Sequence, residues 1–174
     1  MSSPATAATL DVAAPHADPR APRRVRHQPR RRTLTITRAE MIAAHMVRVT
    51  LTGDLEGFVS LGFDDHVKLF FADGTVDAAG APNTLSRDFT PRRHDAAANT
   101  LEIDFAVHDA GPATRWAAQA KPGDTLNLGG PRGSFIIPTD YDWHLLVGDE
   151  TALPAIIMPG SPASRSSPKR CASS

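Results

Sequence analysis

Apolar and polar residues alternate along several short segments of the chain, a period typical of β-strands that bury one face. Thr100–His108 alternates most clearly, and we predict that its apolar side chains point inward while Glu102, Asp104 and His108 point outward. Residues 73–86 are rich in Gly, Ala, Pro, Asn and Ser and predict a loop. The same alternation predicts strands over Thr33–Arg38 and His45–Thr52. Arg87–Arg93 predicts a short extended segment, and three further strands are predicted over Asp65–Ala72, Thr125–Leu128 and Ser134–Ile137.

The period changes near Gly111. Pro112–Ala120 predicts a short helix with proline at its first position, and Lys121–Asp124 predicts the turn that ends it. Many short strands with one late helix predict a mainly β protein built around a small closed barrel.

Beyond the barrel, the sequence predicts the beginning of an α/β unit. Asp142–Val147 has the pattern of a buried strand, and the turn at Gly148–Thr151 leads into a predicted helix over Ala152–Ile157. We therefore assign residues 33–140 to the barrel and residues 141–157 to the start of a second domain. Residues 158–174 contain three prolines and predict a disordered tail where the helix should continue. We interpret this tail as the product of a shifted reading frame, because one choice of codons encodes a helix and a buried strand in another frame.

Charge is unevenly distributed along the chain. Residues 1–32 hold seven arginines and no regular period, whereas residues 33–157 hold 9 basic and 17 acidic residues. A basic N-terminal segment of this kind binds nucleic acid or anionic lipid, or it is a solvated tail. We predict a disordered, solvated tail, because the segment has no aromatic residues for base stacking and no amphipathic pattern for a membrane surface.

Composition narrows the class of protein further. Cys171 is the only cysteine, so one chain has neither an internal disulfide nor a thiolate metal cluster, and we expect no metal site. No apolar run approaches the ~20 residues of a membrane helix, and the first residues lack the apolar stretch of a secretory signal. We expect a cytoplasmic protein with no membrane insertion and no nucleic-acid partner.

Ser86–Arg92 is the first of three segments with candidate chemistry. It resembles the Arg-x-aromatic-Ser/Thr flavin motif of ferredoxin-reductase-type barrels. The resemblance implies that the guanidinium of Arg87 binds a phosphate, that Phe89 stacks on the isoalloxazine ring, and that Thr90 hydrogen-bonds to the polar edge of that ring. On an ordinary strand, the same residues are a surface charge and a core ring.

The second segment follows the strand that ends at His108. It resembles the place where the helix of such barrels begins against the flavin pyrophosphate, because a helix N-terminus offers free N–H groups and a partial positive charge. Gly111 permits close approach of the backbone, and Ala113 and Thr114 follow in the first turn. We expect Trp116 in the core, whereas His108 either contacts the flavin or lies at the surface.

The third segment begins with Gly129–Phe135, which is glycine-rich but lacks the lysine of a nucleotide P-loop. After it, Gly148–Pro154 resembles the Gly-x-x-Thr-x-x-Pro turn that opens the NAD(P)H domain of flavin reductases. The resemblance implies that Gly148, Glu150 and Thr151 lie on the NAD(P)H side of the site.

In this order, the three segments resemble the siderophore-interacting proteins, a family of FAD-dependent ferric-siderophore reductases, over about residues 33–157. The resemblance implies a six-stranded antiparallel Greek-key barrel for FAD, followed by an NAD(P)H domain of which this chain holds only the first strand and helix. Electrons would pass from NAD(P)H through FAD to the Fe(III)-siderophore, with no catalytic acid–base residue. Lys68 either holds an anionic ferric chelate or is a solvated strand lysine.

Two alternatives stay open. One is a flavin-binding module that accepts no hydride from NAD(P)H. The other is a fragment that does not fold stably, since residues 141–157 would expose an apolar strand.

Overall fold

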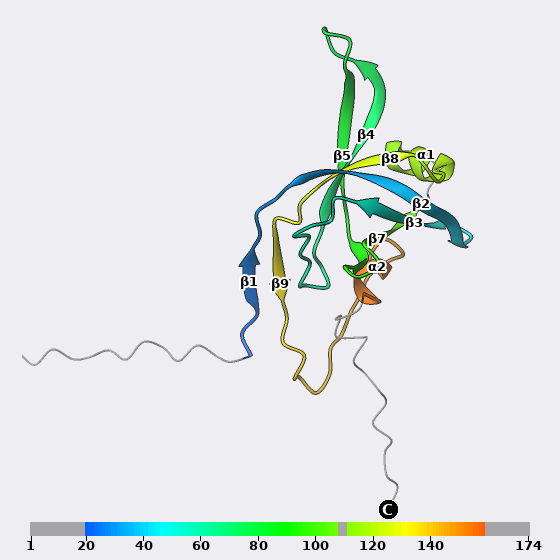
Figure 1. Cartoon of the computed structure of the whole chain (residues 1–174). Coiled ribbons are helices and arrows are strands. Elements are labelled where there is room, and N and C mark those ends of the chain that lie inside the picture. The colour runs from blue at the N-terminus through cyan, green and yellow to red at the C-terminus, as the bar shows by residue number, and fades with distance from the viewer. Residues whose placement is uncertain (1–19, 108–110, 159–174) are drawn as a thin grey trace, which may run out of the picture.

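The computed structural model describes residues 20–107 and 111–158 (Figure 1). The elements in this part of the chain are β1 (Arg23–Arg26), β2 (Arg31–Ala43), β3 (Met46–Gly53), β4 (Val67–Val76), β5 (Pro82–Phe89), β6 (Pro91–Asp95), β7 (Thr100–Ala106), α1 (Pro112–Gln119), β8 (Thr125–Gly129), β9 (Gly133–Ile136) and α2 (Leu153–Ile156).

A curled antiparallel sheet in the order β5-β4-β8-β2-β3-β7-β6 forms the body of the molecule. Its two end strands, β5 and β6, are consecutive in the chain and separated only by Thr90. β5 pairs with β4, whereas β6 pairs with β7. Residues 82–95 therefore join the two ends of the sheet. With β5 and β6 counted as one bent strand, the sheet has the six strands that the family resemblance implied, and the mainly β fold class is confirmed.

The interior of the barrel is filled by the alternating apolar residues of its strands, as predicted. Ten of them are at most 1% exposed: Leu34, Ile36, Val49, Leu51, Val67, Leu69, Leu101, Ile103, Phe105 and Leu128. Helix α1 covers one end of this core, with the ring of Trp116 centred 5.6 Å from Phe71 and 5.5 Å from Phe105. The expectation that Trp116 belongs to the core is confirmed.

The loop predicted over residues 73–86 is wrong. β4 continues to Val76 and β5 begins at Pro82, so the two strands form a long hairpin that projects from the barrel in Figure 1. Asp77 stabilises the turn, because its carboxylate accepts hydrogen bonds from the backbone N–H groups of Ala79 and Ala81. Most of the hairpin is exposed beyond Ala72, and no buried face imposes an alternating period on its sequence.

The N-terminal boundary predicted at residue 32 is also wrong for the described residues. β1 pairs with β9 in a separate two-stranded sheet, and β2 already begins at Arg31. His27 Nε2 lies 2.7 Å from Ser134 Oγ, a contact between residues 107 positions apart. A strand whose partner is this distant leaves no local period in the sequence. Residues 1–19 lie outside the described residues.

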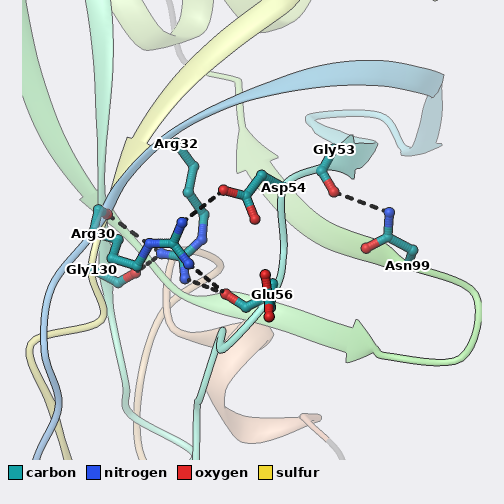
Figure 2. Close-up of polar contacts among 7 residues, drawn as sticks. All are labelled: Arg30, Arg32, Gly53, Asp54, Glu56, Asn99 and Gly130. Atoms are coloured by element: carbon teal, nitrogen blue, oxygen red, sulfur yellow. Dashed lines mark hydrogen bonds and ion pairs between the residues drawn. The ribbon is translucent and has the colours of Figure 1, made fainter.

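Hydrogen bonds of Arg32 and Arg30 attach the start of β2 to neighbouring loops. Its side chain is buried, and the guanidinium donates to the carbonyl oxygens of Arg30, Glu56 and Gly130 at 3.4, 3.1 and 3.3 Å (Figure 2). Neighbouring Arg30 donates to the Asp54 carboxylate at 2.9 Å. Burial, and secondarily the charge of Arg30, lower the pKa of Arg32.

The strand predicted over Asp142–Val147 does not form. Trp143, Leu145 and Val147 are 76%, 74% and 84% exposed, and no described strand pairs with this segment. A buried strand of an α/β unit needs neighbouring strands and covering helices, which the described chain does not provide here. The helix that follows is a single turn, α2, where Ala152–Ile157 was predicted. Within the described residues, no helix has the length and apolar character that crossing a bilayer requires.

Candidate flavin cleft

A cleft of about 720 Å³ opens where β5 passes into β6. Its walls come from this junction, from the end of β7, from the start of α1 and from the turn before α2. The residues that line it are His66, Arg87, Asp88, Phe89, Thr90, Asp104, Ala106, Gly111, Pro112, Ala113, Thr114, Glu150, Thr151 and Pro154. Eight of the residues singled out from the sequence are therefore brought to one place.

Arg87, Phe89 and Thr90 form the wall at the β5–β6 junction. Arg87 is exposed, and its guanidinium donates one hydrogen bond within the described residues, to the Ser86 carbonyl at 2.9 Å. The half-buried ring of Phe89 packs on the core, with its centroid 4.6 Å from that of Phe105. An arginine fork and a braced aromatic ring thus lie within one cleft, next to the hydroxyl of Thr90.

The opposite wall is the first turn of α1. Gly111 precedes the helix with φ 139°, a conformation that essentially only glycine adopts. The first turn contains no acidic residue, and among the described residues no side chain caps its N–H groups. Ala113 and Thr114 of this turn line the cleft, so backbone N–H groups, the Thr114 hydroxyl and the partial positive charge of the helix N-terminus lie at its wall. His108 lies outside the described residues.

Asp104 lies in the wall of the cleft, which the sequence analysis missed. Asp104 alternates with the core residues Ile103 and Phe105, as predicted, but its side chain is only 3% exposed, which the alternating pattern did not predict. Its two carboxylate oxygens accept from Nε and a terminal nitrogen of Arg48 at 2.7 and 2.8 Å. This hydrogen-bonded carboxylate raises the pKa of Arg48. The alternating pattern of β7 shows a polar residue here, but only the cross-strand register reveals its partner.

Lys68 lies outside the walls of this cleft. Its Nζ donates to both oxygens of Asp88, at 2.9 and 3.1 Å. Together with Arg31 and Arg132, it lines an adjoining cleft of about 420 Å³. His66 and Asp88 line both clefts, so the basic cleft begins at the rim of the first one.

The three residues predicted on the NAD(P)H side are placed differently from one another. Glu150 and Thr151 line the main cleft, whereas Gly148 does not. The backbone N–H and the hydroxyl of Thr151 donate to one oxygen of Asp149 at 2.9 and 2.6 Å. These bonds, the side-chain one foremost, lower the pKa of Asp149. The turn is therefore ordered by its own residues.

Comparison with known proteins agrees with a flavin barrel. The family model of the siderophore-interacting FAD-binding domain matches residues 35–135. The chain therefore belongs to the siderophore-interacting FAD-binding domain family.

Similar proteins include two named reductases and a protein of known structure. An NADPH-dependent ferric-chelate reductase of Escherichia coli is 46% identical over 151 residues, which is 79% of this chain and 59% of that protein. The ferric vibriobactin reductase ViuB of Vibrio cholerae is 35% identical, over 72% of this chain and 51% of that protein. The crystal structure of a siderophore utilization protein from T. fusca has a TM-score of 0.69 and 40% identity, over 78% of this chain and 57% of that one. The chain thus spans somewhat more than half the length of these relatives.

Proposed function

We propose that this chain is the flavin-binding part of an NAD(P)H:ferric-siderophore oxidoreductase and that FAD binds in the main cleft. One observation carries the proposal: the cleft brings Arg87, Phe89 and Thr90 of the β5–β6 junction opposite the first turn of α1. The named relatives, which are ferric-chelate and ferric vibriobactin reductases, support the same chemistry. A cytoplasmic location belongs to this proposal, because NAD(P)H is supplied there.

The described residues fit the chemical groups of FAD. Arg87 and the N–H groups of Ala113 and Thr114 are donors suited to the pyrophosphate, and these residues line the same cleft. Phe89 offers a flat apolar surface whose position is fixed from behind by Phe105. Thr90 adds a hydroxyl for a polar ring edge. When bound, FAD supplies the conversion between two-electron hydride transfer and single-electron transfer to Fe(III). The protein positions the cofactor and provides the electrostatic surroundings.

The adjoining basic cleft is suited to an anionic ferric chelate. Its described lining includes four cations, Arg30, Arg31, Lys68 and Arg132, and the shared residues His66 and Asp88 place this cleft at the rim of the flavin cleft. An anion held there lies close to the cofactor, which electron transfer requires. The oxygen donors of siderophores hold Fe(III) far more tightly than Fe(II), so reduction loosens the iron.

A second candidate function is a flavin-binding module without NAD(P)H-dependent activity. The observation that favours it is the exposed segment from Trp143 to Val147, which forms no strand in the described structure. The described residues therefore form no folded NAD(P)H domain around Gly148, Glu150 and Thr151. Their role in binding NAD(P)H stays a prediction.

The visible spectrum of the purified protein after incubation with FAD and gel filtration tests both candidates. Retained flavin absorption that bleaches rapidly on anaerobic mixing with NADPH, and returns with a ferric chelate, supports the reductase in this chain. Retained absorption that persists with NADPH, but bleaches with dithionite, supports the module. A protein that retains no flavin contradicts both.

A further inference from the structure

The ion pair between Arg48 and Asp104 stands apart from the other charges around the flavin cleft. The two residues face each other across β3 and β7 in direct register. Both oxygens of the Asp104 carboxylate are bonded to the guanidinium, at 2.7 and 2.8 Å. The Asp104 side chain is 3% exposed and the Arg48 side chain 23%. The geometry is bidentate, which fixes the carboxylate in one orientation.

Asp104 is the one buried charged residue among the described residues that line the cleft. Arg87 and Glu150 are exposed, and Asp88 is bonded to exposed Lys68. Water screens those charges, whereas a charge within the wall acts through a medium of low effective dielectric constant. The charge of Asp104 or of Arg48 therefore acts more strongly on a molecule in the cleft than a single charge at the rim does.

A buried ion pair is by itself weak evidence for a contribution to the stability of the barrel. Buried ion pairs can often be replaced by apolar residues with little loss of stability, because desolvation offsets the attraction between the charges. The pair also brings a carboxylate to a surface that, under the proposed function, receives a redox cofactor. These two facts point to an electrostatic role.

We propose that the Arg48–Asp104 pair sets the reduction potential of the flavin, with Asp104 as the group that lowers it. The inference rests on the proposed function, because it requires flavin in the cleft. Reduction of a flavin by two electrons and one proton adds one negative charge to the cleft. The carboxylate disfavours that added charge, and Arg48 limits this effect by neutralising the carboxylate. A lower potential favours electron transfer to ferric chelates, which are themselves hard to reduce.

Removing the carboxylate and removing the guanidinium should shift the midpoint potential of the flavin in opposite directions. Asp104→Asn leaves the guanidinium without its carboxylate and raises the midpoint potential. Glu40 and Glu102 also lie near Arg48 and make this upward shift smaller than a fully isolated cation would give. Arg48→Met leaves the carboxylate without its cation and lowers the midpoint potential. The double variant removes both charges and returns towards the parent value.

The experiment is a redox titration of each FAD-loaded variant against a reference dye, with xanthine and xanthine oxidase as the reductant. Arg48→Lys is the matched control, because it keeps the charge, and we expect it to stay close to the parent. A loosened cleft wall would shift both single variants in the same direction, and that result would overturn the inference. An unchanged potential in Asp104→Asn would also overturn it.

A variant that does not fold, or a protein that binds no FAD, can be distinguished from a failure of this inference. If Asp104→Asn does not fold, the comparison of Arg48→Met with Arg48→Lys decides the question, because equal potentials in these two contradict the proposal. If the parent protein binds no FAD, the proposed function fails with it. If the parent binds FAD and the potentials do not respond to the pair, only this inference fails.

Discussion

Replacing Arg87 with alanine removes the only arginine among the described residues that line the flavin cleft. The side chain is exposed, and in the described part of the chain its guanidinium makes one hydrogen bond, to the Ser86 carbonyl. The fold therefore loses little, and the main loss falls on a ligand phosphate. Hydrogen bonds to charged groups contribute about 1.5–3 kcal/mol. With about 1.4 kcal/mol for each factor of ten, the dissociation constant for FAD should rise roughly 10- to 150-fold.

The assay is an equilibrium titration of the cofactor-free protein, followed by flavin fluorescence. Riboflavin, which has no phosphate, is the matched ligand, and its affinity should be the same in the parent and in Arg87→Ala. Arg93→Ala is the matched protein control, because Arg93 is an exposed arginine of the neighbouring strand β6 that pairs with Asp95. Arg87→Lys should lie between parent and alanine, since it keeps the charge but loses the fork. Unchanged FAD affinity in Arg87→Ala, or an equal loss for FAD and riboflavin, would refute the assignment of the phosphate contact.

Three further predictions concern stability. Gly111→Ala should lower the free energy of unfolding by about 1–3 kcal/mol, because alanine is strained at φ 139°; an unchanged denaturant midpoint would contradict this. Deleting residues 1–30 should lower the melting temperature relative to deleting residues 1–19, because it removes β1 and its pairing with β9; equal melting temperatures would show that this pairing contributes nothing. Burial lowers the pKa of His94 in the folded state below its ordinary value of 6.5. The unfolded chain therefore binds the proton more readily, and stability should fall as pH drops through about 6.5. His94→Gln should flatten this dependence in urea titrations at several pH values, and an unaltered slope would exclude His94 as its source.

Local motifs made much of the candidate site predictable. Arg87, Phe89 and Thr90 are consecutive or nearly so, and Gly111–Thr114 is a helix start, so each set is positioned by its own stretch of backbone. The structure adds that both sets line one cleft. That they contact flavin stays a prediction.

The parts that could not be predicted depend on distant partners. Asp104 occupies a polar position of an alternating strand, and the sequence gives no sign that Arg48, 56 residues earlier, neutralises and buries it. β1 is held by β9 in the same way, although its composition is that of a solvated segment. The opposite error occurred at Asp142–Val147, where an apolar pattern predicts a strand but no described strand is there to pair with it. The apolar pattern of a segment shows which side chains it can bury, whereas the neighbouring strands and helices determine whether those side chains are buried.

The junction at Thr90 also determines when the site comes into existence during folding. β2–β3 and β4–β5 are hairpins that join neighbouring parts of the chain, but β8 must pair with both β2 and β4, as in Leu34 with Leu126 and Leu69 with Leu128. Such non-local pairs carry a large loop-closure cost and form slowly. The segment that bears Arg87 and Phe89 reaches its final place only when it also pairs at both ends of the sheet. A partly folded chain therefore has no complete cleft to offer, and a ligand of the cleft binds only the finished barrel and stabilises it by mass action. Under the proposed function, loading of FAD therefore follows the last strand pairings, and a chain arrested with separate hairpins stays empty.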